Sequence, residues 1–239
     1  QIFKSVKIMF MKNIQLFLFF IFITPLFSEE GRLGRESNEY KYNSLGLSLV
    51  QTEDTGLGVN LSVSLPGSLY ITLERKAEGI DVDTESFDRI VNAARIGVHS
   101  GIGDLLSSIS AKGVNLKIKN VFDIYAEIGI KSTSIEGDIN SFSEDDAQAN
   151  IITGIRFGDS NGWEGKIFVD FSKESEVIQR PCLSEVCPAV LEYILDEETD
   201  QKYGAGVLFN INNRSAFKVE VLSSKLFDTS LKIGYQLNF

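Results

Sequence analysis

Residues 229–239 read TSLKIGYQLNF, and from Leu231 to the end of this segment every second side chain is apolar. The residues between them are polar or glycine, so the segment has the two-residue period of a β-strand with one apolar and one polar face. In water the apolar face would pack against a core, whereas in a membrane it would face lipid and the polar face would line a barrel interior. The apolar residues are Leu231, Ile233, Tyr235, Leu237 and Phe239.

The same alternation recurs along most of the chain. Ile90 to Val98 is a weaker run because Asn92 interrupts its apolar face, and we divide residues 100–119 into two short strands, with one irregular strand as the alternative. These patterns predict an all-β fold, a transmembrane antiparallel up-and-down β-barrel of about twelve strands, with ten or eight strands as alternatives. The clear runs cover residues 45–49, 57–65, 69–73, 122–130, 151–157, 163–171, 203–211 and 217–221.

Turn residues and acidic segments separate these runs. Pro66-Gly67 predicts a tight turn, and residues 77–88, 136–147 and 173–201 are interpreted as loops. If residue 239 ends in the periplasm, the short turns at 159–162 and 212–214 are periplasmic and the two longest loops are external. Short turns on one side and long loops on the other are typical of transmembrane barrels.

The terminal strand, with its alternating apolar residues and final phenylalanine, resembles the last strand of Gram-negative outer-membrane β-barrels. The likeness covers about residues 44–239 and is to small barrels of the outer-membrane-protein-A-like or X-like superfamily. It implies location in the cell outer membrane beside lipopolysaccharide, with Leu231, Ile233, Tyr235, Leu237 and Phe239 as the signal read by the barrel-assembly machinery. A soluble periplasmic barrel or sandwich is the alternative.

The first 28 residues have the features of a secretory signal peptide. Lys4, Lys7 and Lys12 precede the apolar run from Ile14 to Phe27, and cleavage after Ser28 would follow. An uncleaved membrane anchor is the alternative, although the run is short for a span. Residues 29–43 are polar and unpatterned, and we interpret them as a mobile periplasmic lead-in that precedes a barrel at 44–239.

The charge of the chain argues against nucleic-acid binding. Its 23 basic and 33 acidic residues give a formal net charge of −10. Removal of the first 28 residues, which hold three lysines and no acid, would leave −13. Proteins that bind nucleic acid need a basic surface instead.

The polar faces of the clear strands carry four acidic and five basic residues. In a narrow barrel such inward charges must pair with one another, and near-balance favours a closed salt-bridge network over a selective channel, which needs rings of one sign. The predicted lumen charge network comprises Glu127, Lys131, Arg156, Glu164, Lys166, Asp170, Lys218, Glu220 and Lys232.

Two further features lie in the predicted loops. Cys182 and Cys187 are the two cysteines of the chain, and in an oxidising compartment we expect them to form a disulfide. Pro188 to Leu195 could form a short helix beside it. Acid clusters at 81–88, 136–146 and 196–200 could bind divalent cations beside lipopolysaccharide, although a solvated repulsive surface is the simpler interpretation.

The sequence favours a non-enzymatic protein without a cofactor. His99 is the one histidine, and in a strand the adjacent Ser100 would point to the opposite face, so the two cannot act as a pair. No nucleophile, phosphate-loop or metal motif is present. We therefore expect a structural or interaction role through acidic external loops, with a narrow porin-like channel for ions or small solutes as the alternative.

Overall fold

The computed structural model describes residues 40–52, 54–82, 85–102, 122–137, 141–143, 147–159, 162–181 and 191–239. The chain divides into two units, residues 1–35 with Phe239, and residues 36–238. The second unit contains the sheet, and it is described by itself. Among the described residues, no helix has the length and apolar character needed to cross a membrane.

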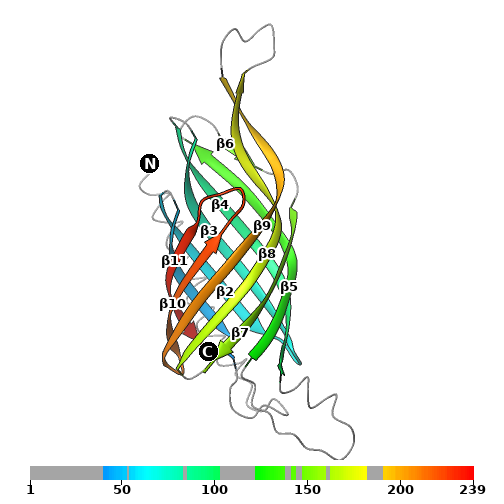
Figure 1. Ribbon diagram of the computed structural model, residues 1–239, viewed down its shortest axis with the longest axis vertical. Helices are drawn as coiled ribbons and strands as arrows, with labels where there is room; N and C mark the ends of the chain where they lie inside the picture. Colours follow the sequence, from blue (N-terminus) through cyan, green and yellow to red (C-terminus); the bar gives the residue numbers. More distant parts are fainter. Residues whose placement is uncertain are drawn as a thin grey trace, which may run out of the picture. The chain divides into compact units, whose positions relative to one another are not determined.

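The described residues of the second unit form a closed antiparallel β-barrel (Figure 1). Ten strands pair in the order β4-β3-β2-β1-β11-β10-β9-β8-β7-β5, and pairing of β4 with β5 closes the sheet. Closure removes free edges from the wall of the barrel, and β6 is a short addition to β5. The strands are β1 (Ser44–Gln51), β2 (Thr55–Ser64), β3 (Leu69–Val82), β4 (Glu85–Gly101), β5 (Phe122–Gly137), β6 (Ser141–Ser143), β7 (Gln148–Gly158), β8 (Trp163–Pro181), β9 (Leu191–Asn212), β10 (Ser215–Ser223) and β11 (Ser230–Asn238).

The fold class is confirmed, with ten barrel strands rather than twelve. The predicted strands within 100–119 are wrong as wall strands, because β4 pairs directly with β5 from Phe87↔Gly137 to Gly101↔Asp123. No strand can lie between two strands that share one ladder. Most of residues 100–119 lie outside the described part of the chain.

Two of the predicted loops are largely strand. Residues 77–88 continue β3 to Val82 and begin β4 at Glu85, so only two residues separate them. Residues 173–201 continue β8 to Pro181 and begin β9 at Leu191. The acidic content misled the prediction, because Glu78 and Glu174 occupy inward positions where basic side chains neutralise them. In 136–147, β5 extends to residue 137 and β6 occupies 141–143.

The short and long connections are not separated between the two ends of the barrel as completely as the sequence predicted. The end that carries the short turns 65–68, 159–162 and 213–214 also carries the connection from β4 to β5, residues 102–121. The two ends differ more in how far the strands project. At the opposite end, the hairpin of β8 and β9 extends far beyond its neighbours (Figure 1).

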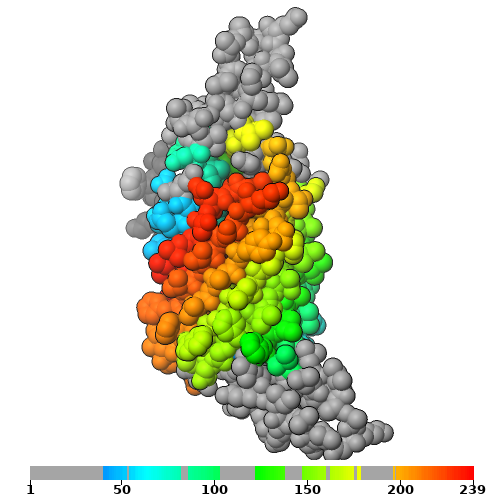
Figure 2. All heavy atoms as spheres, viewed as in Figure 1, coloured from blue at the N-terminus to red at the C-terminus, as the bar shows by residue number. Residues whose placement is uncertain are grey.

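The outside of the barrel is apolar. Every barrel strand exposes at least two large hydrophobic side chains, and the tilted strands lie side by side across the surface (Figure 2). On β9 the apolar outward residues run from Tyr203 to Ile211, nine residues or about 27 Å along the strand. A transmembrane strand needs about 9–11 residues. Beyond Tyr203 the next outward residue is Gln201, so the apolar belt has a defined edge.

Candidate functional site in the barrel interior

The interior of the barrel is polar and contains a cavity of about 210 Å³. Alternation along each strand turns one set of side chains outward to the belt and the other inward. The structure places all nine residues of the predicted lumen charge network on the walls of this cavity, on strands β5, β7, β8, β10 and β11. These residues are Glu127, Lys131, Arg156, Glu164, Lys166, Asp170, Lys218, Glu220 and Lys232.

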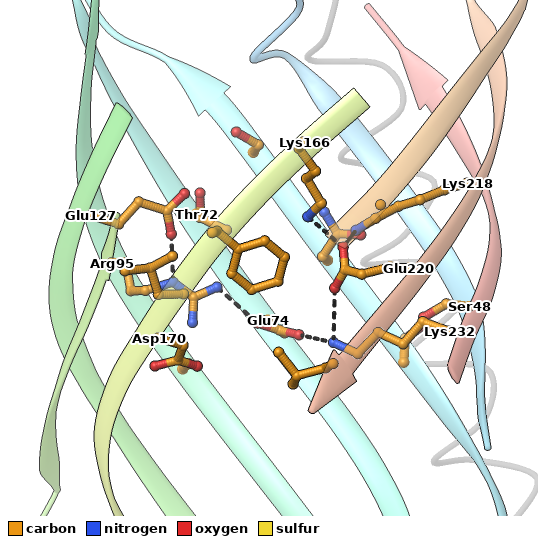
Figure 3. Close-up of a pocket in the computed structure, with 18 of the residues that line it drawn as sticks. Ser48, Thr72, Glu74, Arg95, Glu127, Lys166, Asp170, Lys218, Glu220 and Lys232 are labelled. Atoms are coloured by element: carbon orange, nitrogen blue, oxygen red, sulfur yellow. Dashed lines mark hydrogen bonds and ion pairs between the residues drawn. The ribbon is translucent and has the colours of Figure 1, made fainter. Parts of the chain in front are cut away.

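Glu74 joins two sides of the barrel (Figure 3). Its Oε2 accepts a hydrogen bond from Arg95 Nη2 at 2.8 Å, and its Oε1 accepts one from Lys232 Nζ at 3.0 Å. Arg95 also donates from Nε to Glu127 Oε2 at 2.7 Å. This chain of contacts links β5, β4, β3 and β11 across the lumen.

Glu220 forms the second centre of the same layer (Figure 3). Lys166 contacts its Oε2, and Lys218 lies 3.0 Å from the same oxygen. Lys232 lies 3.9 Å from Oε1, so it is shared between Glu220 and Glu74. One buried carboxylate therefore holds lysines from three strands.

A second ion-pair layer lies nearer the extended hairpins and is centred on Glu174. Its carboxylate contacts Arg89, Lys131 and Lys202, which come from three other strands. Arg89 also reaches Glu78 at 3.1 Å. Arg89 and Glu174 are each 1% exposed, so this layer is shielded from water.

Among the strand residues that are buried inside the barrel or line its cavity, the charges balance. Nine basic residues face nine acidic ones, and most of each set contact the other. Neutrality fits an internal network that satisfies itself, because a filter for one ion type needs an excess of one sign. The basic residues are Lys76, Arg89, Arg95, Lys131, Arg156, Lys166, Lys202, Lys218 and Lys232, and the acidic ones are Glu74, Glu78, Asp123, Glu127, Glu164, Asp170, Glu174, Asp200 and Glu220.

Half of this network was missing from the sequence-based set. Glu78 and Glu174 lie in segments interpreted as loops, and Arg89 lies between the predicted loop at 77–88 and the predicted strand that starts at Ile90. Glu74 and Arg95 lie in strands whose inward charges were not counted. Alternation gives no clear signal at Arg89, because Ile90 and Val91 are adjacent apolar residues that point to opposite faces of β4. The acids that precede it favoured a loop.

The residues before β1 enter the mouth of the barrel at the short-turn end. Tyr40 and Tyr42 are 5% and 7% exposed, and with Tyr70 they form a buried aromatic cluster. The Tyr42 ring stacks on His99 with 4.0 Å between ring centroids and an interplanar angle of 20°. The mobile lead-in predicted for 29–43 is therefore wrong at its last four residues, because their rings are buried against the barrel wall.

Hydrogen bonds fix these residues in the mouth. The Tyr42 hydroxyl donates to Asp123 Oδ2 at 2.6 Å, and Arg156 donates from Nη1 to the Lys41 carbonyl at 3.1 Å. Burial raises the pKa of the Tyr42 phenol well above its usual value, so the hydroxyl stays protonated and remains a donor. We call Tyr42, Tyr70 and His99, with Asp123, the floor of the cavity.

The floor explains His99 as a packed aromatic residue. It is 6% exposed, its Nδ1 lies 3.4 Å from Asp123 Oδ2, and its backbone N–H donates to Ser68 O at 2.9 Å. Tyr70 reaches the same place because Gly97 has no side chain. A Cβ at Gly97 would lie 2.2 Å from Tyr70 Cζ.

An apolar cluster lies at the other end of the interior. Phe87, Ile135 and Val177 are buried together, and Ile80 packs against them. They come from β4, β5, β8 and β3, so the cluster connects opposite walls. We call these four residues the roof. Between floor and roof, Tyr125, Phe168 and Leu222 form a third buried cluster.

Several predicted features lie outside the described residues. Cys182 and Cys187 are among them, so their disulfide stays a prediction, as does the signal peptide at 1–28. The short helix predicted for Pro188 to Leu195 is wrong over its last five residues, because β9 begins at Leu191 and pairs there with β8. Within the described ranges, no group of three or more His, Cys, Asp or Glu side chains is arranged to hold a metal ion. In the predicted assembly signal, Ile233, Tyr235 and Leu237 face outward on β11, which pairs with β1 and β10.

Comparison with known proteins gives structural similarity without sequence similarity. No family model and no curated protein matches the chain. Similar solved structures include a KdgM porin, with 7% identity, a TM-score of 0.43, and coverage of 82% of this chain and 99% of that one. A KdgM porin in complex with disordered oligogalacturonate has 11% identity, a TM-score of 0.33, and coverage of 82% and 99%.

A further similar structure is a loop L8 deletion mutant of OmpT, an outer membrane protein of Vibrio cholerae. It has 9% identity and a TM-score of 0.28, with coverage of 82% of this chain and 97% of that one. Identities this low carry no information about substrate or partner. The chain itself is a closed, ten-stranded antiparallel β-barrel with an apolar outside and an interior of paired charges.

Proposed function

We propose that the chain is an integral outer-membrane β-barrel with a closed lumen, which acts as a structural or interaction protein through its external hairpins. The observation that carries the membrane assignment is the apolar belt, to which all ten strands contribute. Soluble proteins rarely expose apolar patches of more than a few hundred Å², whereas a bilayer requires such a surface. A small barrel of the outer-membrane-protein-A-like or X-like kind remains the proposed relative.

The proposed orientation places the short turns in the periplasm and the extended hairpin of β8 and β9 outside the cell. Outer-membrane barrels have short periplasmic turns and longer extracellular segments. The floor would then face the periplasm and the roof the outside. Under this orientation β11 would present Ile233, Tyr235 and Leu237 to the lipid and to the barrel-assembly machinery.

Closure of the lumen supports a role other than free diffusion. The floor, the roof and two ion-pair layers occupy the interior. Separating these buried ion pairs to open a path would cost free energy. We expect the refolded chain without residues 1–28 to insert into planar bilayers and give no discrete current steps. Heat-modifiable migration on gels provides the control for folding. Reproducible steps from the wild-type barrel would contradict a closed lumen.

A narrow channel for ions or small solutes is the second candidate. The cavity of about 210 Å³ favours it, because this volume holds several water molecules. Conduction would require both the floor and the roof to move. The bilayer measurement decides between the two candidates.

The hairpin of β8 and β9 is the proposed interaction element, with lipopolysaccharide as its partner through bridging divalent cations. Asp196 and Glu198 are exposed on the part of β9 that extends beyond the apolar belt, on the same face of the strand as Asp200. Carboxylate oxygens of the protein and phosphate oxygens of the lipid are ligands that Mg²⁺ and Ca²⁺ prefer. No enzymatic activity and no resident cofactor are part of this proposal.

Neutralising these two acids tests the interaction. We expect the double variant Asp196→Asn, Glu198→Gln to fold normally and to lower Mg²⁺-dependent retention of purified lipopolysaccharide by at least about threefold, because two ligand charges are lost. The control is Asp159→Asn in a turn at the other end of the barrel. Equal retention by all three proteins would contradict the proposed partner.

A further inference from the structure

We propose that residues 40–43, which we call the strap, are a removable closure of the periplasmic mouth that gates access to the cavity. The strap would act as an internal ligand for the floor, with Tyr42 as the side chain that fills it. This inference does not depend on the role of the external hairpins. It concerns entry to the lumen from one end only.

The first line of evidence is how completely the barrel surrounds Tyr42. His99 stacks on its ring, and Tyr70 packs at 4.4 Å between centroids. The Arg156 guanidinium lies 4.8 Å from the ring centroid, a distance at which cation–π attraction operates. With the 2.6 Å hydrogen bond to Asp123, every part of the phenol has a partner from the wall.

The other strap residues bind around the rim of the mouth. The Tyr40 hydroxyl donates to Gly158 O at 3.3 Å, and Lys41 Nζ donates to Asn213 O at 2.9 Å. Asn43 Oδ1 accepts a hydrogen bond from the Ser64 backbone N–H at 2.6 Å. These contacts lie on β7, the β9–β10 turn and β2, so the strap crosses the opening instead of following one strand.

The second line of evidence is that the strap takes no part in the sheet. β1 begins at Ser44 and its pairings with β2 and β11 start at that residue. Withdrawing residues 40–43 would therefore break side-chain contacts and single hydrogen bonds but no ladder. A closure that can leave without unfolding the wall has the property that a gate requires.

The position of the strap relative to the cavity gives the gate its effect. Tyr42 and Lys41 line the cavity from the mouth side, whereas Arg89 lines it near the roof. Departure of the strap would open the cavity to the periplasm and leave the roof in place.

Thiol labelling inside the cavity tests the gate. Thr72 is 8% exposed and lines the cavity just above the floor. In a barrel with Cys182 and Cys187 replaced by serine, we expect Thr72→Cys to react slowly with a membrane-impermeant methanethiosulfonate. The double change Tyr40→Ala, Tyr42→Ala should raise the rate at least tenfold. Tyr42→Phe keeps the stacked ring but loses the bond to Asp123, so its rate should be intermediate.

Two controls keep the result interpretable. Ser68→Cys lies in an exposed periplasmic turn, and its labelling rate should be the same with and without the strap tyrosines. An unchanged rate at Thr72→Cys in the double variant would overturn the proposal. Faster labelling accompanied by loss of heat-modifiable migration would also overturn it, because the strap would then be part of the fold. Conduction also requires the roof to move, so a silent wild-type barrel is compatible with either outcome of the labelling test, and the two proposals can fail separately.

Discussion

Replacing Ile128 by arginine is expected to lower the free energy of unfolding by about 2–4 kcal/mol in lipid vesicles. Ile128 lies on β5 in the middle of the apolar belt, and 64% of it is exposed. Its cross-strand neighbours are Ile96 on β4 and Ile151 on β7. An arginine there would place a charge against acyl chains. Equilibrium unfolding in urea, followed by tryptophan fluorescence from Trp163, measures the change.

The matched control is Ser134→Arg. Ser134 also points outward on β5, four residues beyond Ile130, which is the last apolar outward residue of that strand. Near the interface the same charge should cost about 0–1 kcal/mol. If the barrel were soluble, both substitutions would be surface changes worth about 0.5 kcal/mol or less, so equal effects would contradict the membrane assignment.

Replacing Glu174 by glutamine is expected to destabilise the barrel by about 3–5 kcal/mol. Glu174 is the shared partner of Arg89, Lys131 and Lys202, and it is 1% exposed. The amide would keep the shape but remove the negative charge, which would leave three cations facing one another without water. The urea midpoint of the refolded variant measures the loss.

Asp88→Asn is the control for this prediction. Asp88 is an acid on β4 at a similar height, but it points outward and is exposed, so its loss should change stability by about 0.5 kcal/mol or less. A Glu174→Gln barrel as stable as this control would mean that the Glu174 layer contributes little. A double variant with Lys131→Met should recover part of the loss, because one of the uncompensated cations is removed.

Local alternation was enough to predict the strands whose two faces differ most in polarity. The runs ending at Leu237, Ile211 and Phe171 were identified because each residue of such a strand faces either the lipid or the polar lumen. Apolar and polar side chains therefore alternate along it without a break. The same pattern placed all nine members of the predicted charge network inside. It failed over residues 77–88 and 173–201, because acidic residues are frequent enough there to give a strand the composition of a loop.

The preferred count of twelve strands was wrong for a different reason, and the alternative of ten is the number in the barrel. Residues 100–119 contain short alternating stretches, and only the ladder between β4 and β5 excludes them from the wall. Ladders join residues far apart in the chain, so no local pattern reports them. The direct pairing of Arg95 with Gly129 is decided by closure of the whole sheet.

By itself the sequence determined that the chain is an all-β barrel, which side chains point outward, and that the inward charges nearly balance. Each of these depends on a period of two, which a strand imposes on every neighbouring pair of residues. Only the tertiary structure decided that Glu174 and Glu220 each gather three basic residues and that Tyr42 stacks on His99. Those contacts join side chains from strands on different sides of the lumen, and their geometry exists only once the sheet has closed.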